Sequence, residues 1–137
     1  MKKTLFFCIL LSSSMIHANN LETIAQTIQE EKIYTFDELN VPPHPIDGLK
    51  KFYQYIGENL NVDNYKFNGK IRILIRFIIE KDGKMTNVIV KDDGGRPDIA
   101  KRAVKVLQSK KCPKWEAGIL NGIKVRTTFE IPIVISK

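Results

Sequence analysis

The chain has 137 residues, of which 43% are hydrophobic and 27% are charged, and its formal net charge is +7. This length and composition are typical of one globular domain with one modest core, so we expect a single folded domain. The positive charge suits anionic surfaces or acidic peptides, but it is a weak indicator of function.

The N-terminus has the layout of a secretory signal peptide. Two early lysines precede an apolar run over residues 5–11, and a small residue follows at Ala18. The run is too short to span a bilayer comfortably. We therefore predict a signal peptide over residues 1–18, with a cut after Ser14 or an uncleaved membrane anchor as alternatives. Cleavage after Ala18 removes both lysines and leaves a net charge of +5 (7 − 2).

Residues 19–45 are predicted to be an N-terminal extension of the domain. Helical spacing of apolar residues indicates a short helix over residues 20–31, and residues 33–36 favour a brief strand. The proline-rich segment that ends at Pro45 excludes regular structure. The folded domain is then expected over residues 46–137.

Two amphipathic helices are predicted in this domain. The first follows Asp47, a residue type that suits a helix N-cap. The second begins at Pro97, which fits the first turn of a helix, and runs to about Ser109. Their apolar stripes consist of Leu49, Phe52, Tyr53, Ile56 and Leu60 in the first helix, and of Ile99, Ala100, Ala103, Val104 and Leu107 in the second.

The remaining regular elements are strands. Residues 71–79 carry apolar side chains on both faces, as a central strand does, and Lys81-Asp82-Gly83-Lys84 predicts a hairpin turn to a partner over residues 85–90. Gly83 is a structural residue here, because the turn requires positive φ. With a last strand over residues 123–135, these elements predict an α+β fold. It is a two-layer domain with a small antiparallel sheet of about three strands packed against two helices, in the order α-β-β-α-β.

The last strand is the element in which we place the function. Alternate positions from Ile123 to Ile135 are apolar, while Lys124, Arg126, Thr128 and Glu130 fall on the other face. Pro132 lies within the run, and a residue without an N–H loses a ladder bond in the middle of a sheet. This strand is therefore predicted to be an edge strand.

Groups that could perform catalysis are few. His44 is the one histidine left after cleavage and lies between prolines, and Cys112 is the one cysteine left, expected to be packed and inert. Asp92 and Asp93 lack the spacing of a calcium loop. The basic residues near the second helix lack the interleaved aromatic residues of a nucleic-acid surface. We therefore expect no enzyme activity, no metal, no cofactor and no nucleic-acid partner.

The segment Pro113-Lys114-Trp115-Glu116-Ala117-Gly118, followed by Asn121-Gly122 and Val125-Arg126, resembles the C-terminal domain of TonB family proteins. The resemblance extends over about residues 33–135 and includes Gly69-Lys70-Ile71, the hairpin turn, and Pro132-Ile133. It implies a periplasmic protein-binding module. Such a module binds an extended peptide of TonB-dependent outer-membrane transporters, or of other envelope proteins, as a strand added beside its own last strand.

Strand addition uses main-chain hydrogen bonds for affinity and alternate side chains for specificity. Arg126, Thr128, Glu130 and Lys124 are accordingly the candidate partner-binding residues, while Trp115, Gly118 and Gly122 are expected to set the start of the strand. The short extension is a departure from the family's energy transducers, which have a long proline-rich spacer. We expect an adaptor or accessory in TonB-dependent transport. The alternatives are a short energy transducer anchored in the inner membrane, if the N-terminus is uncleaved, and a periplasmic homodimer formed through the same edge.

Overall fold

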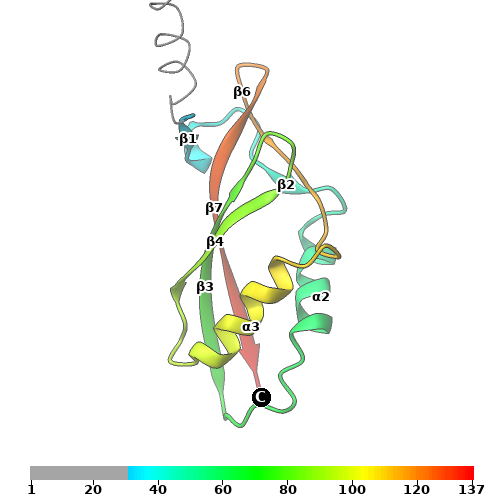
Figure 1. Ribbon diagram of the computed structural model, residues 1–137, viewed down its shortest axis with the longest axis vertical. Helices are drawn as coiled ribbons and strands as arrows, with labels where there is room; N and C mark the ends of the chain where they lie inside the picture. The colour runs from blue at the N-terminus through cyan, green and yellow to red at the C-terminus, as the bar shows by residue number, and fades with distance from the viewer. Residues whose placement is uncertain (1–30) are drawn as a thin grey trace, which may run out of the picture. The chain divides into compact units, whose positions relative to one another are not determined.

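The computed structural model describes residues 31–137 (Figure 1). The predicted signal peptide, and all but the last residue of the helix predicted over residues 20–31, lie outside the described residues. Everything below concerns the compact unit formed by Lys32–Lys137.

Two helices and several strands make up this unit. In chain order the elements are β1 (Ile33–Tyr34), the 3-10 helix η1 (Phe36–Glu38), β2 (His44–Pro45), α2 (Leu49–Leu60), β3 (Lys70–Ile79), β4 (Met85–Asp92), α3 (Pro97–Leu107), β5 (Trp115–Glu116), β6 (Gly118–Leu120) and β7 (Ile123–Ser136). The predicted α+β class and the order α-β-β-α-β of the long elements are confirmed.

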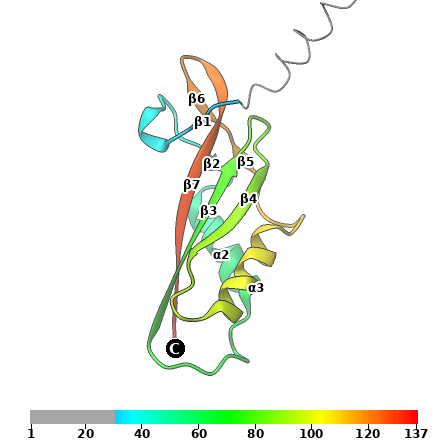
Figure 2. The same ribbon diagram turned by 60° about the vertical axis from the view of Figure 1, so that its left-hand side comes forward.

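The main sheet has the strand order β1-β7-β3-β4, with β6 also paired to β7. Among the long strands, β3 is antiparallel to both β4 and β7, as predicted, and the predicted hairpin joins β3 to β4. The sheet is larger than the three strands expected. The additional strands are β6, antiparallel to β7, and β1, which pairs with β7 in parallel. Figure 2 shows the three long strands side by side, with β3 between β7 and β4.

Helix α2 begins one residue later than its predicted cap would require. Gly48, with φ of 87°, occupies the N-cap position, and no side chain caps the helix, so the assignment of this role to Asp47 was wrong. Phe52, Ile56 and Leu60 are buried as the periodicity predicted. Leu49 and Tyr53 are exposed, because the helix buries a narrower stripe than its sequence offers.

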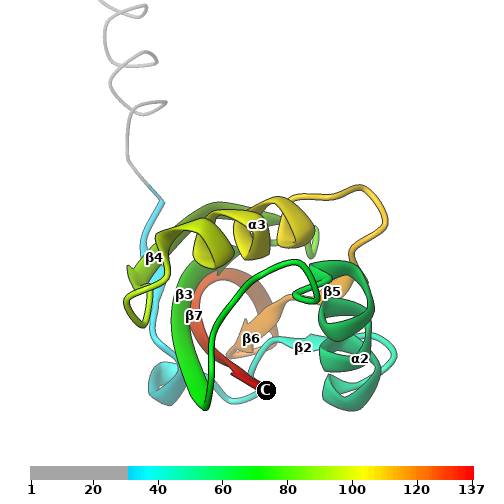
Figure 3. The same cartoon turned by 90° about the horizontal axis from the view of Figure 1, so that it is seen from below.

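Helix α3 has Pro97 in its first turn, as predicted, and buries Ile99, Ala100, Ala103 and Leu107. Figure 3 shows α2 and α3 on the same side of the long strands, so the domain has two layers. The Tyr55 hydroxyl donates a hydrogen bond of 3.1 Å to the Val106 carbonyl and thereby ties the two helices together.

The core lies between these layers and is rich in aromatic side chains. The Trp115 ring packs against Phe52, Phe77 and Phe129, with ring centroids 5.1, 5.6 and 5.2 Å away. Centroid distances of this size give favourable edge-to-face contacts. Since Phe129 belongs to β7, the buried face of the last strand is fixed to the centre of the core.

The segment that precedes α2 is tied onto the domain at three places. β1 pairs with β7, β2 pairs with β5, and Val41 forms a bridge with Ile119 of β6. His44 and Pro45 pair with Glu116 and Trp115 as a short strand. The prediction that the proline-rich segment has no regular structure was therefore wrong at these two residues. Residues 33–45 are therefore part of the fold.

Candidate functional site

The last strand has different neighbours along its length. Thr127 pairs with Ile79 of β3 and with Tyr34 of β1, so these two strands lie on opposite sides of β7 at this residue. Before Thr127, β7 is also paired with β6. From residue 128 to residue 136, β3 is the sole strand paired with β7 within residues 31–137. We call residues 128–136 the β7 edge.

The prediction of an edge strand therefore holds for the second part of β7 and not for its start. The pairing of β7 with β3 is unbroken from Thr127 to Ser136, and Pro132 stands opposite Leu74 within it. A strand directs the backbone groups of alternate residues to its two sides. The β7 edge accordingly presents peptide groups that have no partner strand in the described part of the chain.

The two faces of β7 follow the predicted alternation. Thr127, Ile131, Ile133 and Ile135 are buried, whereas Pro132 and Val134 are exposed, the latter by 60%. Ile123 is an exception, since this apolar residue is 65% exposed beside the β6–β7 turn. The buried face thus packs the strand against the core, while Pro132 and Val134 are exposed on the opposite face.

Arg126, a candidate contact residue, is engaged within the domain. Its Nε lies 2.7 Å from Oε2 of Glu80, and its Nη2 lies 3.1 Å from Oε1 of the same carboxylate. This hydrogen-bonded guanidinium lowers the pKa of Glu80 below its ordinary value of 4.5. Both side chains are about three-quarters buried. Arg126 thus stabilises the pairing of β7 with the end of β3, where β1 also docks.

Glu130 and Thr128 lie beside a cavity at the start of the β7 edge. Glu130 forms an ion pair of 2.6 Å with Arg76, its direct partner across the sheet. The cavity has a volume of about 570 Å³ and is lined by Thr35, Phe36, Asp37, Arg76, Thr128, Phe129 and Glu130. Arg76 and Phe36 were not predicted to belong to this site. The charge of Arg76 is visible in the sequence, and pairing β3 with β7 in the observed register places it opposite Glu130. The position of Phe36 could not be predicted in this way, because it depends on the parallel pairing of β1 with β7.

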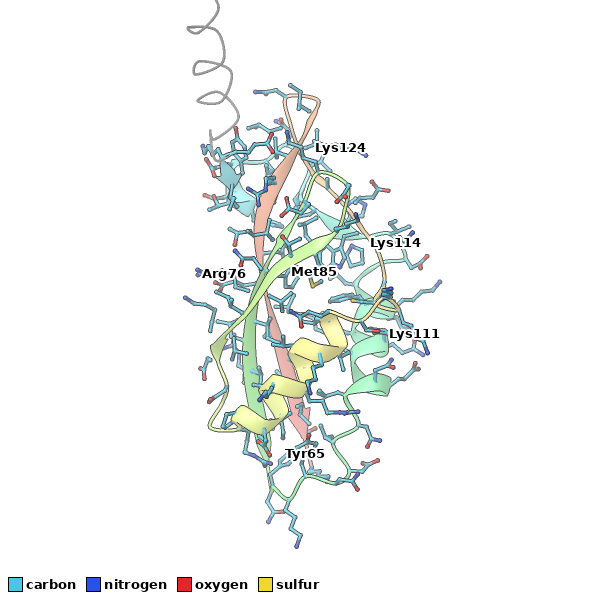
Figure 4. All side chains as sticks on the ribbon, in the orientation of Figure 1. Tyr65, Arg76, Met85, Lys111, Lys114 and Lys124 are labelled. Atoms are coloured by element: carbon cyan, nitrogen blue, oxygen red, sulfur yellow. The ribbon has the colours of Figure 1, made fainter. Side chains whose placement is uncertain are left out.

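Lys124 is separate from these residues. It lines another cavity, of about 620 Å³, between the β3–β4 turn and the segment that joins α3 to β5. Figure 4 shows Lys124 near the upper end of the domain and Arg76 lower, on β3. The structure therefore places Thr128 and Glu130 at one cavity, Arg126 in an internal ion pair, and Lys124 at a second cavity.

The residues predicted to be structural lie at close contacts or turns. A Cβ on Gly83 would lie 2.0 Å from the Trp115 carbonyl oxygen, and one on Gly118 would lie 2.5 Å from Oγ1 of Thr127. Gly83 also has φ of 81°, while Gly122 has φ of 77° in the β6–β7 turn and open space around it. Trp115 is 3% exposed. In the described structure, Gly83, Gly118 and Trp115 thus lie at close contacts or in the core, and Gly122 lies in the turn that leads into β7.

The sheet has a second margin at β4, and its geometry differs. The β3–β4 register shifts twice, between Leu74 and Ile75 and between Arg76 and Ile78. Asn87 within β4 has φ of 53°. Such irregularities blunt an edge strand against the addition of another strand. The β7 edge has no register shift against β3 and is therefore the better template.

Among the residues that the structure describes, the His44 ring and the Cys112 thiol form no hydrogen bond with each other. Burial raises the pKa of the Cys112 thiol to about 11, which disfavours the nucleophilic thiolate. The Nδ1 atom of His44 lies 3.2 Å from the carbonyl oxygen of Pro42. Within residues 31–137, no three His, Cys, Asp or Glu side chains are grouped so that they could hold a metal ion.

The fold and the β7 edge together define the class of protein. It is a two-layer α+β domain whose last long strand has an edge without a partner strand in the described residues. Residues 69–134 match the family model described as "Gram-negative bacterial TonB protein C-terminal", so this part of the chain is similar to that family. The family is a transport-associated, non-enzymatic one with a role in TonB-dependent transport. Comparisons with curated proteins and with solved structures gave no match.

The match covers α3 and the strands from β3 to most of β7, but it does not include β1, η1, β2 or α2. Proteins of this family are associated with the cell envelope. Neither helix of the described part, residues 31–137, has the length and apolar character required to cross a membrane.

Proposed function

We propose that this domain binds an extended segment of an outer-membrane transporter as a strand added along the β7 edge. In this role it is a periplasmic adaptor or accessory in TonB-dependent transport. The observation that carries the proposal is the pairing pattern of β7, which has β3 on one side of residues 128–136 and no strand on the other within the described residues.

The geometry of the edge supports strand addition in two ways. First, the edge is long and regular, so a partner can form successive main-chain hydrogen bonds without a register shift. Second, its buried face is fixed in the core through Ile131, Ile133 and Ile135. A strand that is already rigid loses little conformational entropy when it binds a partner.

β1 also supports this proposal, because it already uses the same side of β7. It pairs in parallel with Arg126 and Thr127 and then ends, since the chain turns into η1 at Thr35. Glu38 fixes this turn by accepting hydrogen bonds from the backbone N–H and the hydroxyl of Thr35. The added strand would continue along β7 from the point where β1 stops, with Thr128 and Glu130 beside its first residues.

The test is a titration of the mature protein with peptides from the periplasmic N-terminal segments of outer-membrane transporters, followed by backbone amide NMR signals. We expect shifts to concentrate at residues 128–136, with small changes in β4. The same peptide with proline substituted at alternate positions is the matched control, because it cannot form the ladder. The proposal fails if no transporter peptide shifts these signals, or if the proline control shifts them equally.

Self-association through the same edge is the competing outcome. Sedimentation at several protein concentrations distinguishes it, because a stable dimer that pairs the two β7 edges leaves no site for a peptide. A monomer at all concentrations that binds peptide supports the proposal. A dimer that excludes peptide overturns it in favour of a structural role.

A further inference from the structure

A second cavity, of about 620 Å³, lies away from the β7 edge. We call it the lysine-rimmed cavity. It is lined by Ile46, residues 81–86, residues 107–110 and residues 112–117, together with Lys124. Its volume falls within the range of ligand and peptide-anchor sites. Figure 4 shows Met85, Lys114 and Lys124 in the part of the domain where these segments meet.

The cavity has an apolar interior. Met85, Leu107, Cys112, Pro113 and Trp115 all contribute to its lining. Leu107 and Trp115 are buried residues of the core, and Met85 and Cys112 pack against that core. Ile46, which is 54% exposed, lies at its border. An apolar side chain that entered here would contact the hydrophobic core without displacing any element of it.

Positive charge dominates the rim. Five lysines line the cavity, namely Lys81, Lys84, Lys110, Lys114 and Lys124, against two acidic residues, Asp82 and Glu116. Lys84 is paired with Asp82, at 3.4 Å. Lys110, Lys114 and Lys124 form no ion pair within residues 31–137. Three cations beside an apolar recess are thus available to an acidic partner.

The distribution of these charges indicates what kind of anion fits. The lysines come from the β3–β4 turn, the segment after α3 and the start of β7, so they surround the cavity instead of converging on one point. The C-terminal end of α3 also lies here, and the dipole of a helix disfavours a compact anion at that end. Separate carboxylates along a peptide match this arrangement better than a single phosphate.

We infer that the lysine-rimmed cavity binds an acidic peptide segment of a partner protein, with one apolar side chain of the segment seated in the recess and carboxylates on the surrounding lysines. This site is independent of strand addition at the β7 edge. It gives the domain a second surface, on which a partner is selected by charge.

Trp115 provides a direct probe of this site, because it is the one tryptophan of the chain and lines the cavity. The experiment titrates the full mature protein with the synthetic peptide acetyl-Asp-Glu-Leu-Glu-Asp-amide and follows tryptophan fluorescence. We expect a saturable change that weakens severalfold between low and physiological salt, since exposed charge pairs are screened. The analogue acetyl-Asn-Gln-Leu-Gln-Asn-amide is expected to bind at least about tenfold more weakly.

The decisive variant is Lys114→Glu combined with Lys124→Glu. Each exposed ion pair changes binding about two- to fivefold, so the double charge reversal should weaken binding of the acidic peptide by about tenfold or more. The matched control is Lys50→Glu with Lys51→Glu on α2, which changes the net charge equally outside the cavity. Binding to this control is expected to stay within twofold of the parent. Circular dichroism of each variant establishes that it is folded.

Three outcomes would overturn the inference. One is equal binding of the uncharged analogue. Another is an equal loss of peptide affinity in the control variant, which would show that the effect depends on net charge alone. The third is lysine-dependent binding of phosphatidylglycerol vesicles without binding of the peptide, which would make the surface a lipid site. Transporter peptides at the β7 edge should bind the Lys114→Glu, Lys124→Glu variant normally, so failure of one site is distinguishable from failure of the other.

Discussion

The guanidinium of Arg126 donates two hydrogen bonds to the carboxylate of Glu80 at the junction of β7 and β3, with Nε 2.7 Å from Oε2 and Nη2 3.1 Å from Oε1. This pair lies where β1, β3 and β7 meet. Arg126 accordingly contributes to the stability of the strand junction, although the sequence suggested that it would contact a partner.

The first prediction concerns this pair. Glu80→Gln is expected to lower the free energy of unfolding by about 1–2 kcal/mol at neutral pH, because it removes the charge from a partly buried, hydrogen-bonded pair. Urea denaturation measures the loss. With Arg126→Gln in the same chain, the combined loss should be smaller than the sum of the two single losses. Full additivity would show that the pair contributes nothing.

The pH dependence follows from the lowered pKa of Glu80. Its carboxyl group binds a proton more readily in the unfolded chain, so the pair contributes its full stability above the ordinary value of 4.5 and loses it as the pH falls through the lower folded pKa. The parent protein should therefore lose more stability than Glu80→Gln between neutral pH and acid pH. Parallel curves for the two proteins would contradict this assignment.

The second prediction separates two roles of glycine. Gly83→Ala should destabilise the domain by more than about 3 kcal/mol, because the new Cβ would lie 2.0 Å from the Trp115 carbonyl oxygen at a φ of 81°. Gly122→Ala is the matched control, since its φ of 77° is similar but nothing lies within 4 Å of the new atom. It should cost about 1–2 kcal/mol. Thermal or urea unfolding of both variants measures the difference, and equal losses would show that φ alone matters.

The third prediction concerns the accessibility of the β7 edge. Val134 is 60% exposed on the outer face of the β7 edge. Val134→Lys should leave stability within about 0.5 kcal/mol of the parent, yet weaken binding of a transporter peptide severalfold, because a charged edge residue opposes strand addition. Val134→Thr is the control and should bind like the parent. Isothermal titration calorimetry measures the affinities, and unchanged binding to Val134→Lys would count against the edge.

The fourth prediction concerns the thiol of Cys112. Because burial raises its pKa to about 11, its reaction with a thiol-specific reagent at neutral pH should be much slower than that of the unfolded chain. A Cys8→Ser background ensures that the signal comes from Cys112 alone. The rate should increase with pH through the alkaline range, and urea should remove the protection. Rapid reaction of the folded protein at neutral pH would contradict the raised pKa.

Local patterns predicted the long elements well, because their periodicities reflect burial directly. The period of two in β7 identified Ile131, Ile133 and Ile135 as buried, and the helical period identified Phe52 and Ile56. The turn around Gly83 predicted the β3–β4 hairpin, because the positive φ that such a turn requires is a local property of the sequence.

Contacts between distant segments could not be predicted in this way. β1 has two residues, and its parallel pairing with β7 depends on a register that no local pattern encodes. The partner of Arg126 depends on the same three-strand junction. Lys124 precedes Arg126 by two residues on the same predicted face, but it lines the lysine-rimmed cavity because the β6–β7 pairing begins there. The candidate site was therefore predicted as a strand, while its division into separate surfaces required the tertiary structure.

Amide hydrogen exchange along β7, with and without a transporter peptide, tests the central claim most directly. In the free protein, alternate amides over residues 128–136 should be protected by β3 while the others exchange quickly. Saturation with peptide should protect the fast set as well. Protection of all these amides in the free monomer, or no gain in protection when peptide is bound, would contradict the account.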